Sequence, residues 1–345
     1  MSLRGGCSPR RSNLLLLERL LRTKSKSVLA KTYKTMTLVS IITPSYNQAK
    51  YLERTILSVL NQDYPRIEYI VMDGASSDGS VEIIRKYAGK LAYWESAKDN
   101  GQADAINKGF ARATGGIVAW LNSDDTYLPG AVSAAVKVFE ENPDVVLVYG
   151  NMLAVDESDA TFNTLTYKQL TLEDLLCFQI IGQPAVFMRR PALQKTGGLN
   201  PTFHFLLDHL LWIQIAKQGR ILHAGQTWSA ARYHPEAKNV AKAAEFGREA
   251  FRILDAVAQD FHLAPMLAKI NRRARASAHR VDSRYLLDGG LPAQALAAWF
   301  RALVIFPPVA LKRMNIFVSA VLNLLGLGKW REWVLKRRKK TFAKN

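Results

Sequence analysis

The sequence predicts an α/β fold in which a mostly parallel, Rossmann-like sheet is flanked by helices and followed by a helical C-terminal extension. Two observations carry this prediction. Short apolar runs alternate with amphipathic helical patterns over about 110 residues, which is typical of a parallel sheet with crossover helices. Polar turns fall where each apolar run gives way to a helix. These turns are therefore expected to gather at one edge of the sheet, where open parallel sheets bind their ligands.

The apolar runs are predicted to form five strands, at residues 38–43, 67–72, 91–95, 117–121 and 145–149. Between them, a period near 3.6 predicts helices at 50–62, at 77–87 with Ser77 and Asp78 as caps, after Gly101, and from Pro129, which suits a first helical position. Farther along we expect an extended segment at 183–188, a helix at 206–218, and two edge strands at 221–223 and 226–233. Residues 240–261 and the tail, with a helix pair over 285–307, are predicted to be helical.

These patterns divide the chain into three parts: a basic N-terminal appendage (1–36), an α/β domain (37–238) and a basic helical extension (239–345). Met36 stands directly before the patterned domain and is a second candidate for the start of translation.

The net charge of +18 is concentrated at the two ends of the chain. Residues 1–35 hold nine basic residues against Glu18, and residues 311–345 hold ten against Glu332. A nucleic-acid enzyme would spread its basic residues over the working domain, and no nucleic-acid motif accompanies this charge. Basic ends around a nearly neutral middle instead favour attachment to an anionic membrane surface.

The sequence contains no stretch that is apolar over the roughly 18–20 residues needed to span a bilayer. The longest candidate, 302–328, is interrupted by Pro307-Pro308 and Lys312-Arg313, and Leu14–Leu17 is too short for a secretory signal. Cys7 and Cys177 lie far apart, which suits a reducing compartment. We expect a cytoplasmic protein that is peripheral on the inner face of the plasma membrane.

The predicted strand at 117–121 ends abruptly in Asn122-Ser123-Asp124-Asp125. Two adjacent carboxylates at the carboxyl end of a strand offer hard oxygen ligands. Mg²⁺ is typically held by one or two carboxylates together with the phosphates of a substrate. This stretch therefore predicts the metal and diphosphate end of a nucleotide-sugar site.

Four blocks in order resemble family 2 glycosyltransferases: Ser40–Asn47, Asp73–Ser80, Asp99–Gly109 and Leu121–Asp125. Their order and spacing agree with the family over roughly residues 38–235. The resemblance implies a GT-A fold, a nucleotide-diphosphate sugar donor and a divalent cation, Mg²⁺ or Mn²⁺. The residues that it assigns to the nucleotide sugar are Pro44, Tyr46, Asp73, Gly101, Asp104, Asn122 and Asp124.

Within that set the resemblance gives Asp73 to the base and Asp104 to the nucleotide pocket, although either could instead serve only as a helix cap. Asp124 is the expected metal ligand, helped by Asp125. Asn122 stands where the family usually has the first Asp of an Asp-x-Asp motif, so Asp124 and Asp125 carry the negative charge.

A loop after the last strand resembles one that closes over the diphosphate, with Arg232, His234 and Lys238, and His234 is a further candidate metal ligand.

Asp208 precedes an apolar stretch ending in Trp212, and this block resembles the one that carries the general base of the family. An acceptor hydroxyl has a high pKa, so a positioned carboxylate must take its proton. Apolar neighbours are expected to raise the pKa of Asp208. The family more often has acids in place of Leu207 and Leu210. On the acceptor side we expect Gln183 and Pro184, with Trp212 stacking on a sugar.

Together these interpretations predict an inverting, metal-assisted glycosyltransferase that moves one sugar to a lipid-linked or surface-polysaccharide acceptor. A catalytically silent GT-A protein would not need all of Asp73, Asp124 and Asp208. A nucleotidyltransferase would usually carry a glycine-rich loop after its first strand, where this chain has Pro44–Asn47.

Overall fold

The computed structural model describes residues 36–234, 236 and 242–328. Within that range a mixed sheet of nine strands runs in the order β3-β2-β1-β4-β8-β6-β9-β5, and β7 pairs with β6. The strands are β1 (Val39–Ser45), β2 (Ile67–Asp73), β3 (Tyr93–Ser96), β4 (Ile117–Trp120), β5 (Thr126–Tyr127), β6 (Val145–Val155), β7 (Thr161–Leu165), β8 (Val186–Arg189) and β9 (Arg220–Arg232). The N-terminal appendage, residues 1–35, lies outside the described range.

The half of the sheet formed by β3, β2, β1 and β4 is parallel, as predicted. Every residue of β1 and β4 is buried, because helices cover both faces. Alternate residues of β1 point to opposite layers. Ile41 packs among α2 (Ala49–Leu60), α3 (Ser80–Tyr87) and α5 (Ala131–Glu141), whereas Ile42 packs with α4 (Gln102–Arg112).

The second half of the sheet differs from the prediction. β8 runs antiparallel between β4 and β6, so the predicted fifth strand does not pair with the fourth. The two predicted edge strands at 221–223 and 226–233 are one strand, β9, which lies inside the sheet between β6 and β5. Its pairing with β6 shifts register beside Gly225, where φ is +72° and the strand bends. This irregularity interrupts the apolar pattern of the strand, so the sequence predicted two strands there.

The start of one helix also differs from the prediction. Pro129 was predicted at the first helical position, but α5 begins at Ala131 after Gly130, whose φ of +79° suits glycine. Asp78 accepts hydrogen bonds from the N–H of Ser80 at 3.0 Å and from the N–H of Ala49 at 2.8 Å. One carboxylate therefore ties together the first turns of α2 and α3.

Three further helices complete the α/β domain: α6 (Leu172–Leu176), α7 (Arg190–Thr196) and α8 (Leu207–Ala216). Single 3₁₀ turns lie at η1 (Ala88–Lys90), η2 (Gln183–Ala185) and η3 (Ala243–Glu245). Helix α8 is buried nearly all round, because it lies between the sheet and the C-terminal helices.

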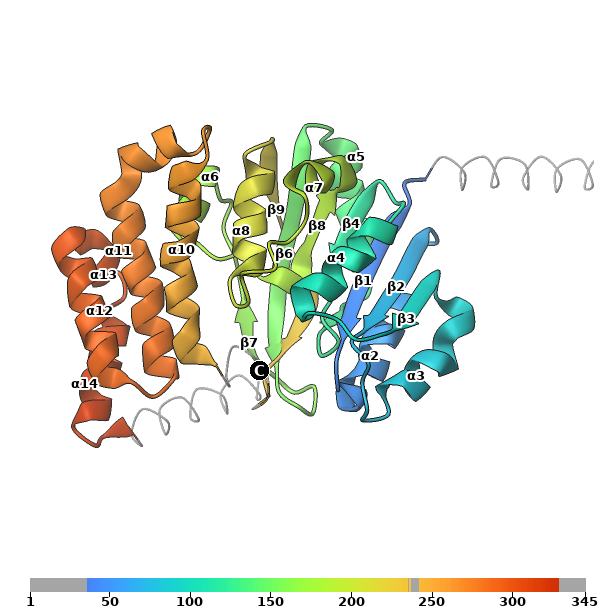
Figure 1. Cartoon of the computed structure of the whole chain (residues 1–345), viewed down its shortest axis with the longest axis horizontal. Helices are drawn as coiled ribbons and strands as arrows, with labels where there is room; N and C mark the ends of the chain where they lie inside the picture. The colour runs from blue at the N-terminus through green and yellow to red at the C-terminus, as the bar shows by residue number, and fades with distance from the viewer. Residues whose placement is uncertain (1–35, 235, 237–241, 329–345) are drawn as a thin grey trace, which may run out of the picture.

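The C-terminal extension is helical, as predicted, and lies beyond α8 at the end of the molecule opposite β3 (Figure 1). It contains α10 (Phe246–Gln259), α11 (Ala264–Asp288), α12 (Pro292–Ile305), α13 (Pro307–Leu311) and α14 (Met314–Leu324). Residues of α10 and α11 join the core of the sheet domain, while α12, α13 and α14 pack on α11 in a smaller cluster. None of the helices described is long and apolar enough to cross a bilayer.

Candidate active site

A cavity of about 730 Å³ opens at the edge of the sheet where β1, β4 and β9 end. Its volume is in the range of ordinary small-molecule sites. The predicted site residues that line it are Pro44, Tyr46, Gly101, Asn122, Asp124, Asp125, Gln183, Pro184 and Asp208. Residues far apart in the sequence therefore meet in one place, as the parallel topology predicted.

The acidic end of β4 faces the end of β9. The Asp124 carboxylate lies 3.1 Å from Nε2 of His234, which is buried against the ring of Tyr51. About a fifth of the Asp124 side chain remains exposed to the cavity. A carboxylate and an imidazole at this separation offer an oxygen and a nitrogen ligand to one cation.

Asp125 has a different environment. Its side chain is buried, and Oδ1 accepts a hydrogen bond from the backbone N–H of Arg232 at 3.0 Å. Burial, with the neighbouring Asp124 carboxylate, raises the pKa of Asp125 well above its ordinary value. Asp125 therefore anchors the β4 loop to β9. Among the described residues, no group of three or more His, Cys, Asp or Glu is arranged to hold a metal. The predicted three-residue ligand set is thus reduced to Asp124 and His234.

Arg232 is also committed to structure. Its guanidinium donates to the carbonyls of Asp124 and Asp156 and to the Asp159 carboxylate, and its side chain is fully buried. Arg232 lines the cavity, but its guanidinium donors hold the backbone at Asp124 and Asp156, so closure of the loop over a diphosphate stays a prediction. Lys238, from the same predicted loop, lies outside the described residues.

Asn122 stands in a chain of side-chain amides. Nε2 of Gln102 donates to Oδ1 of Asn122 at 2.9 Å, and Nδ2 of Asn122 donates to Oε1 of Gln183 at 3.0 Å. Nε2 of Gln183 then donates to the carbonyl of Trp120 at 2.8 Å. An aspartate at position 122 could not donate, so the departure from Asp-x-Asp is matched by an amide partner on β8's preceding turn.

Asp208 lies in the first turn of α8 and faces the cavity. Burial raises the pKa of Asp208 to about 6, the nearby Glu249 adding to the shift and the N–H of His209, at 2.7 Å, opposing it. The prediction of a raised pKa is therefore confirmed. His209 is buried, and its Nε2–H donates to the carbonyl of Leu175 at 2.9 Å, so it belongs to the core.

Asp73 is buried just beneath the edge of the sheet. Its carboxylate accepts hydrogen bonds from the N–H and Oγ–H of Ser76 and from Oγ–H of Ser96. It does not cap α3, because Asp78 contacts the first turn of that helix. Ser76 and Ser96 line a second, open pocket of about 610 Å³.

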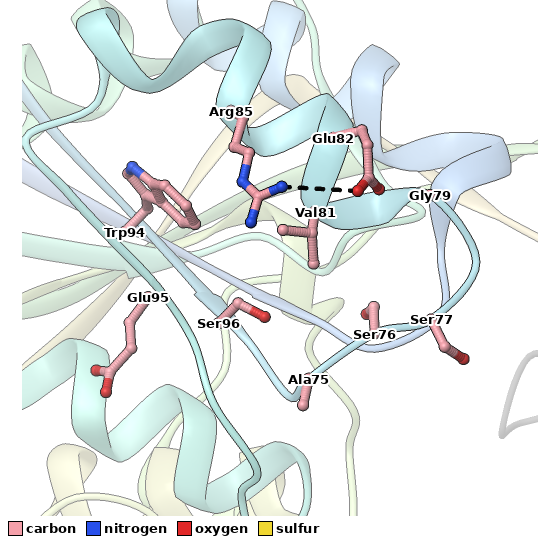
Figure 2. A pocket seen from close by; sticks show the side chains of 10 residues that line it. All are labelled: Ala75, Ser76, Ser77, Gly79, Val81, Glu82, Arg85, Trp94, Glu95 and Ser96. Atoms are coloured by element: carbon pink, nitrogen blue, oxygen red, sulfur yellow. Dashed lines mark ion pairs between the residues drawn. The ribbon is translucent and has the colours of Figure 1, made fainter.

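Figure 2 shows this second pocket between the loop after β2, helix α3 and strand β3. In this view the guanidinium of Arg85 lies between Trp94 and Glu82, and it is 3.8 Å from the Glu82 carboxylate. The chain passes from this pocket at Ala75 to the larger cavity at Gly74. A Cβ at Gly74 would lie 2.7 Å from the Asp99 carboxylate, so glycine permits this close approach.

Asp104 does not line the larger cavity among the residues described. Its carboxylate accepts from the N–H of Asn100 at 3.0 Å and pairs with Lys108 at 3.0 Å. This is the helix-cap alternative that the sequence left open. Gly101 does line the cavity, with a φ of +101° that non-glycine residues avoid. The sequence analysis assigned no role to Asp99 and Gln102, although they belong to the same block, nor to Lys98, which directly precedes it; all three line the cavity.

Trp212 is completely buried and stacks on Trp120 with ring centroids 5.1 Å apart. The prediction that it stacks on an acceptor sugar is wrong, because α8 turns that side chain toward the sheet. Phe205, Phe246 and Tyr233 supply aromatic surface to the cavity instead. The helical period of the sequence did not reveal this, because α8 is apolar on nearly every face.

The charge of the cavity bears on the cation that the site could hold. Five carboxyl groups line it, those of Asp99, Asp124, Asp125, Asp208 and Glu236, and the cationic lining residues in the described range are Lys98 and the fully engaged Arg232. A diphosphate would be repelled here without a further positive charge. Asp124 and His234 fit a divalent ion that a diphosphate helps to ligate.

Comparison with known proteins agrees with this geometry. The sequence model described as glycosyl transferase family 2 matches residues 40–197. A putative teichuronic acid biosynthesis glycosyltransferase of Bacillus subtilis is 32% identical over 189 residues, covering 53% of this chain and 73% of that protein. An uncharacterized glycosyltransferase of Mycobacterium tuberculosis is 40% identical over 176 residues, covering 49% of this chain and 65% of that protein.

Two solved structures share the fold. A mannosyltransferase from Pyrobaculum calidifontis, in complex with GDP-Man and Mn²⁺, aligns with a TM-score of 0.58 at 21% identity, over 85% of this chain and 88% of that one. TarS of S. aureus, residues 1–349 with UDP-GlcNAc, aligns with a TM-score of 0.55 at 16% identity, over 81% of this chain and 92% of that one. These likenesses show a GT-A-type fold with a helical C-terminal region. The matching family model and the Bacillus subtilis relative, which is 32% identical and matched over 73% of its length, show that the chain belongs to glycosyl transferase family 2.

Proposed function

We propose that this glycosyltransferase is a metal-assisted, inverting enzyme that moves one sugar from a nucleoside-diphosphate sugar to an acceptor hydroxyl. The observation that carries the proposal is that one cavity is lined by both Asp124, at the end of β4, and Asp208, at the start of α8. The former supplies a cation ligand and the latter a base with a pKa of about 6.

On the donor side, Asp124 and His234 would hold Mg²⁺ or Mn²⁺, with Asp125 and Arg232 fixing the loop beneath them. The bound cation would neutralise the charge that develops on the leaving diphosphate. Asp73 is proposed to accept a hydrogen bond from the base, since Oδ1 has one described donor, Ser76. Pro44, Tyr46, Gly101 and Asn122 would line the remainder of the donor site.

On the acceptor side, Asp208 would take the proton of the acceptor hydroxyl as its oxygen bonds to the anomeric carbon. The bond from that carbon to the diphosphate oxygen breaks in the same step, which inverts the anomeric configuration. A carboxylate with a pKa near 6 is largely ionised at neutral pH and is a stronger base than an ordinary aspartate. Gln183 and Pro184 lie at the wall of this half of the cavity.

Two rival functions receive less support. A silent GT-A protein would have no use for a half-buried carboxyl group held at the cavity with a raised pKa. A nucleotidyltransferase would bind its triphosphate on a glycine-rich loop after β1, and Pro44–Asn47 has no glycine there.

The acceptor is proposed to be a lipid-linked or surface-polysaccharide intermediate of the cell envelope. The name of the Bacillus subtilis relative, which refers to teichuronic acid biosynthesis, supports this class of acceptor. The proposed location is the inner face of the plasma membrane.

The surface of the C-terminal extension supports membrane attachment. Val304 on α12 is 80% exposed and Leu325 after α14 is 67% exposed. Further large apolar side chains are exposed around them, at Phe300, Leu311, Met314, Val318, Leu324 and Leu327. Lys312 and Arg313 stand among these residues, and such a mixture of apolar and basic side chains suits an anionic interface.

A donor screen tests the central proposal. Purified full-length protein is assayed for nucleoside diphosphate release with a panel of nucleotide sugars, with Mg²⁺, with Mn²⁺ and with chelator. We expect release with one class of donor that chelator abolishes and added metal restores. Activity that chelator leaves unchanged would contradict the metal-assisted mechanism.

Vesicle sedimentation tests the membrane proposal. Val304→Glu and Leu325→Glu should weaken binding to vesicles that contain anionic lipid, because each puts a charge on the proposed contact surface. Phe261→Glu is the matched control, since Phe261 is 86% exposed but lies in the turn between α10 and α11. Equal sedimentation of all three variants would remove the C-terminal surface as the contact.

A further inference from the structure

Glu249 on helix α10 is a buried carboxylate with an unusual set of partners. Its side chain is 4% exposed. Oε1 accepts a hydrogen bond from the N–H of His204 at 2.6 Å, and Oε2 accepts from the N–H groups of Phe205 and Leu206 at 2.8 and 2.7 Å. Three successive backbone donors therefore end on one side chain that lies more than 40 residues away in the sequence.

Those three donors belong to the segment that leads into α8. Leu206 is the N-cap residue of α8, and no side chain of its own caps this helix. A serine or aspartate at that position would satisfy a helix start locally, at a typical gain of about 1 kcal/mol. Glu249 does not replace such a cap: it satisfies the N–H groups of the segment before the helix, and so fixes the chain up to Leu206, two residues before Asp208.

The neighbouring turns of α10 contact the same segment. Phe246, one turn before Glu249, packs against Phe205 with ring centroids 4.9 Å apart and lines the cavity. Arg252, one turn after it, donates to the carbonyl of Thr202 at 3.0 Å and lies over the ring of Phe203. Phe246, Glu249 and Arg252, spaced by three on one face of α10, thus together contact every residue of 202–206.

We propose that Glu249 is a positioning residue for Asp208: by fixing the backbone N–H groups before α8, it lets the C-terminal helical extension set the place of the general base. This proposal rests on the proposed function of Asp208. It assigns α10 a role in acceptor activation, in addition to its part in the core.

Glu249 also acts on Asp208 through its charge, in addition to its hydrogen bonds to the backbone before α8. Besides Glu249, the phenols of Tyr167, before α6, and of Tyr285, on α11, interact electrostatically with Asp208, and Arg252 lies 3.7 Å from the Glu249 carboxylate. Burial raises the pKa of both phenols, that of Tyr285 to about 12, so both are neutral at physiological pH. Glu249 is therefore a negative charge that helps to keep the pKa of Asp208 above that of an ordinary aspartate.

The test compares Glu249→Gln and Glu249→Ala with Asp255→Asn and Asp255→Ala, which change an exposed acid on the same helix. For Glu249→Ala we expect kcat to fall about 10- to 100-fold while the donor KM stays within about twofold, since a base displaced by an ångström loses rate and not donor affinity. For Glu249→Gln, which keeps the side-chain shape, the acidic limb of the kcat/KM–pH profile should move to lower pH.

Two results would overturn the proposal. One is an acidic limb that does not move in Glu249→Gln. The other is a donor KM in Glu249→Ala that worsens by the same factor as kcat, as general unfolding of the site would cause. Should Glu249→Ala fail to fold, the limb of Glu249→Gln decides alone. Asp208→Asn is measured beside them. Retained transfer in that variant removes the base assignment. If Asp208→Asn loses transfer while the Glu249 variants behave like wild type, only the positioning role is removed.

Discussion

The Asp124 carboxylate and the His234 imidazole lie 3.1 Å apart although they are 110 positions apart in the chain. Asp124 lies between β4 and β5, and His234 follows β9, which pairs with β5 and so brings the two segments together. The buried guanidinium of Arg232 joins the two loops from below by donating to the carbonyl of Asp124. The cation proposed for this site would therefore bridge two segments that the protein has already brought together.

Removing either member of this pair should weaken metal binding. We expect Asp124→Asn to lose transfer, and His234→Gln to bind Mn²⁺ about 10- to 100-fold more weakly, the range seen for groups that tune a metal site. The measurement is a Mn²⁺ titration by calorimetry or electron paramagnetic resonance with nucleoside diphosphate present. Asp255→Asn is the control. Unchanged Mn²⁺ affinity in both variants would place the metal elsewhere.

Transfer should depend on pH through Asp208. The base must be ionised, and its pKa is about 6, so kcat/KM should fall as the pH drops below 6 and level off above it. Asp208→Asn should lower kcat by about 10²- to 10⁴-fold, the usual contribution of a general base. A profile in which the wild-type acidic limb lies near pH 4 would argue against this role.

The same carboxyl group should cost stability at neutral pH. The unfolded chain releases the Asp208 proton near its ordinary value of 3.8, while the folded protein holds it to about 6. The free energy of unfolding therefore falls as the pH rises through this window. Asp208→Asn should be more stable than wild type at pH 7.5, by about 1–2 kcal/mol for a partly exposed group. The two should be equally stable near pH 4, and melting temperatures at both pH values would show this.

Trp212 should matter for folding and not for the acceptor. Trp212→Ala removes a ring buried against Trp120 and should lower the free energy of unfolding by about 3–5 kcal/mol. Trp212→Phe keeps most of the packing and loses an indole N–H that has no partner, so its cost should be below about 1.5 kcal/mol. Denaturant unfolding measures both. An acceptor KM that rises in Trp212→Phe would restore the sugar-stacking role.

Restoring Asp-x-Asp through Asn122→Asp should have two opposing effects. A second carboxylate should tighten Mn²⁺ binding, because it adds a hard anionic ligand beside Asp124. It should also destabilise the metal-free protein by about 1 kcal/mol, since the donor to Gln183 is lost and two oxygens then face each other. Thermal melts with and without Mn²⁺ separate these effects. A variant that is stabilised without metal would contradict the amide chain.

The parallel half of the sheet could be predicted because its central strands, β1 and β4, are buried on both faces and each crossover helix is amphipathic. These are local properties that repeat with a fixed period. The position of β8 could not, because the pairing of an antiparallel strand between β4 and β6 depends on contacts between segments about 70 residues apart. The sequence pattern also divided β9 into two strands at Gly225, because the pairing with β6 that continues on both sides of this irregularity is not visible in the sequence.

Site residues divide in a similar way. Asp124 and Asp208 could be found because they follow recognisable blocks and project from the ends of regular elements. Asp125 stands in the same block as Asp124, and Arg232 in the predicted loop, but their partners are visible only in three dimensions: the Asp125 carboxylate accepts from the backbone N–H of Arg232, and the Arg232 guanidinium donates to the carbonyl of Asp124 and to the Asp159 carboxylate. Glu249 has no signal in the sequence, since an acid on an amphipathic helix is usually exposed to solvent.

The reversed direction of β8 has a consequence for how such an enzyme can change its substrates. Because β8 runs against β4, Gln183 and Pro184 reach the cavity from the segment before their strand, whereas the donor residues lie in segments after theirs. If the proposed roles hold, acceptor recognition depends on the stretch that includes β7 and α6, and donor recognition depends on the loops after β1, β2 and β4. Each stretch could be lengthened, shortened or exchanged while the other keeps its register, provided that the hydrogen bond from Asn122 to Gln183, which joins them, is kept. The two specificities could then diverge separately in evolution and in engineered variants.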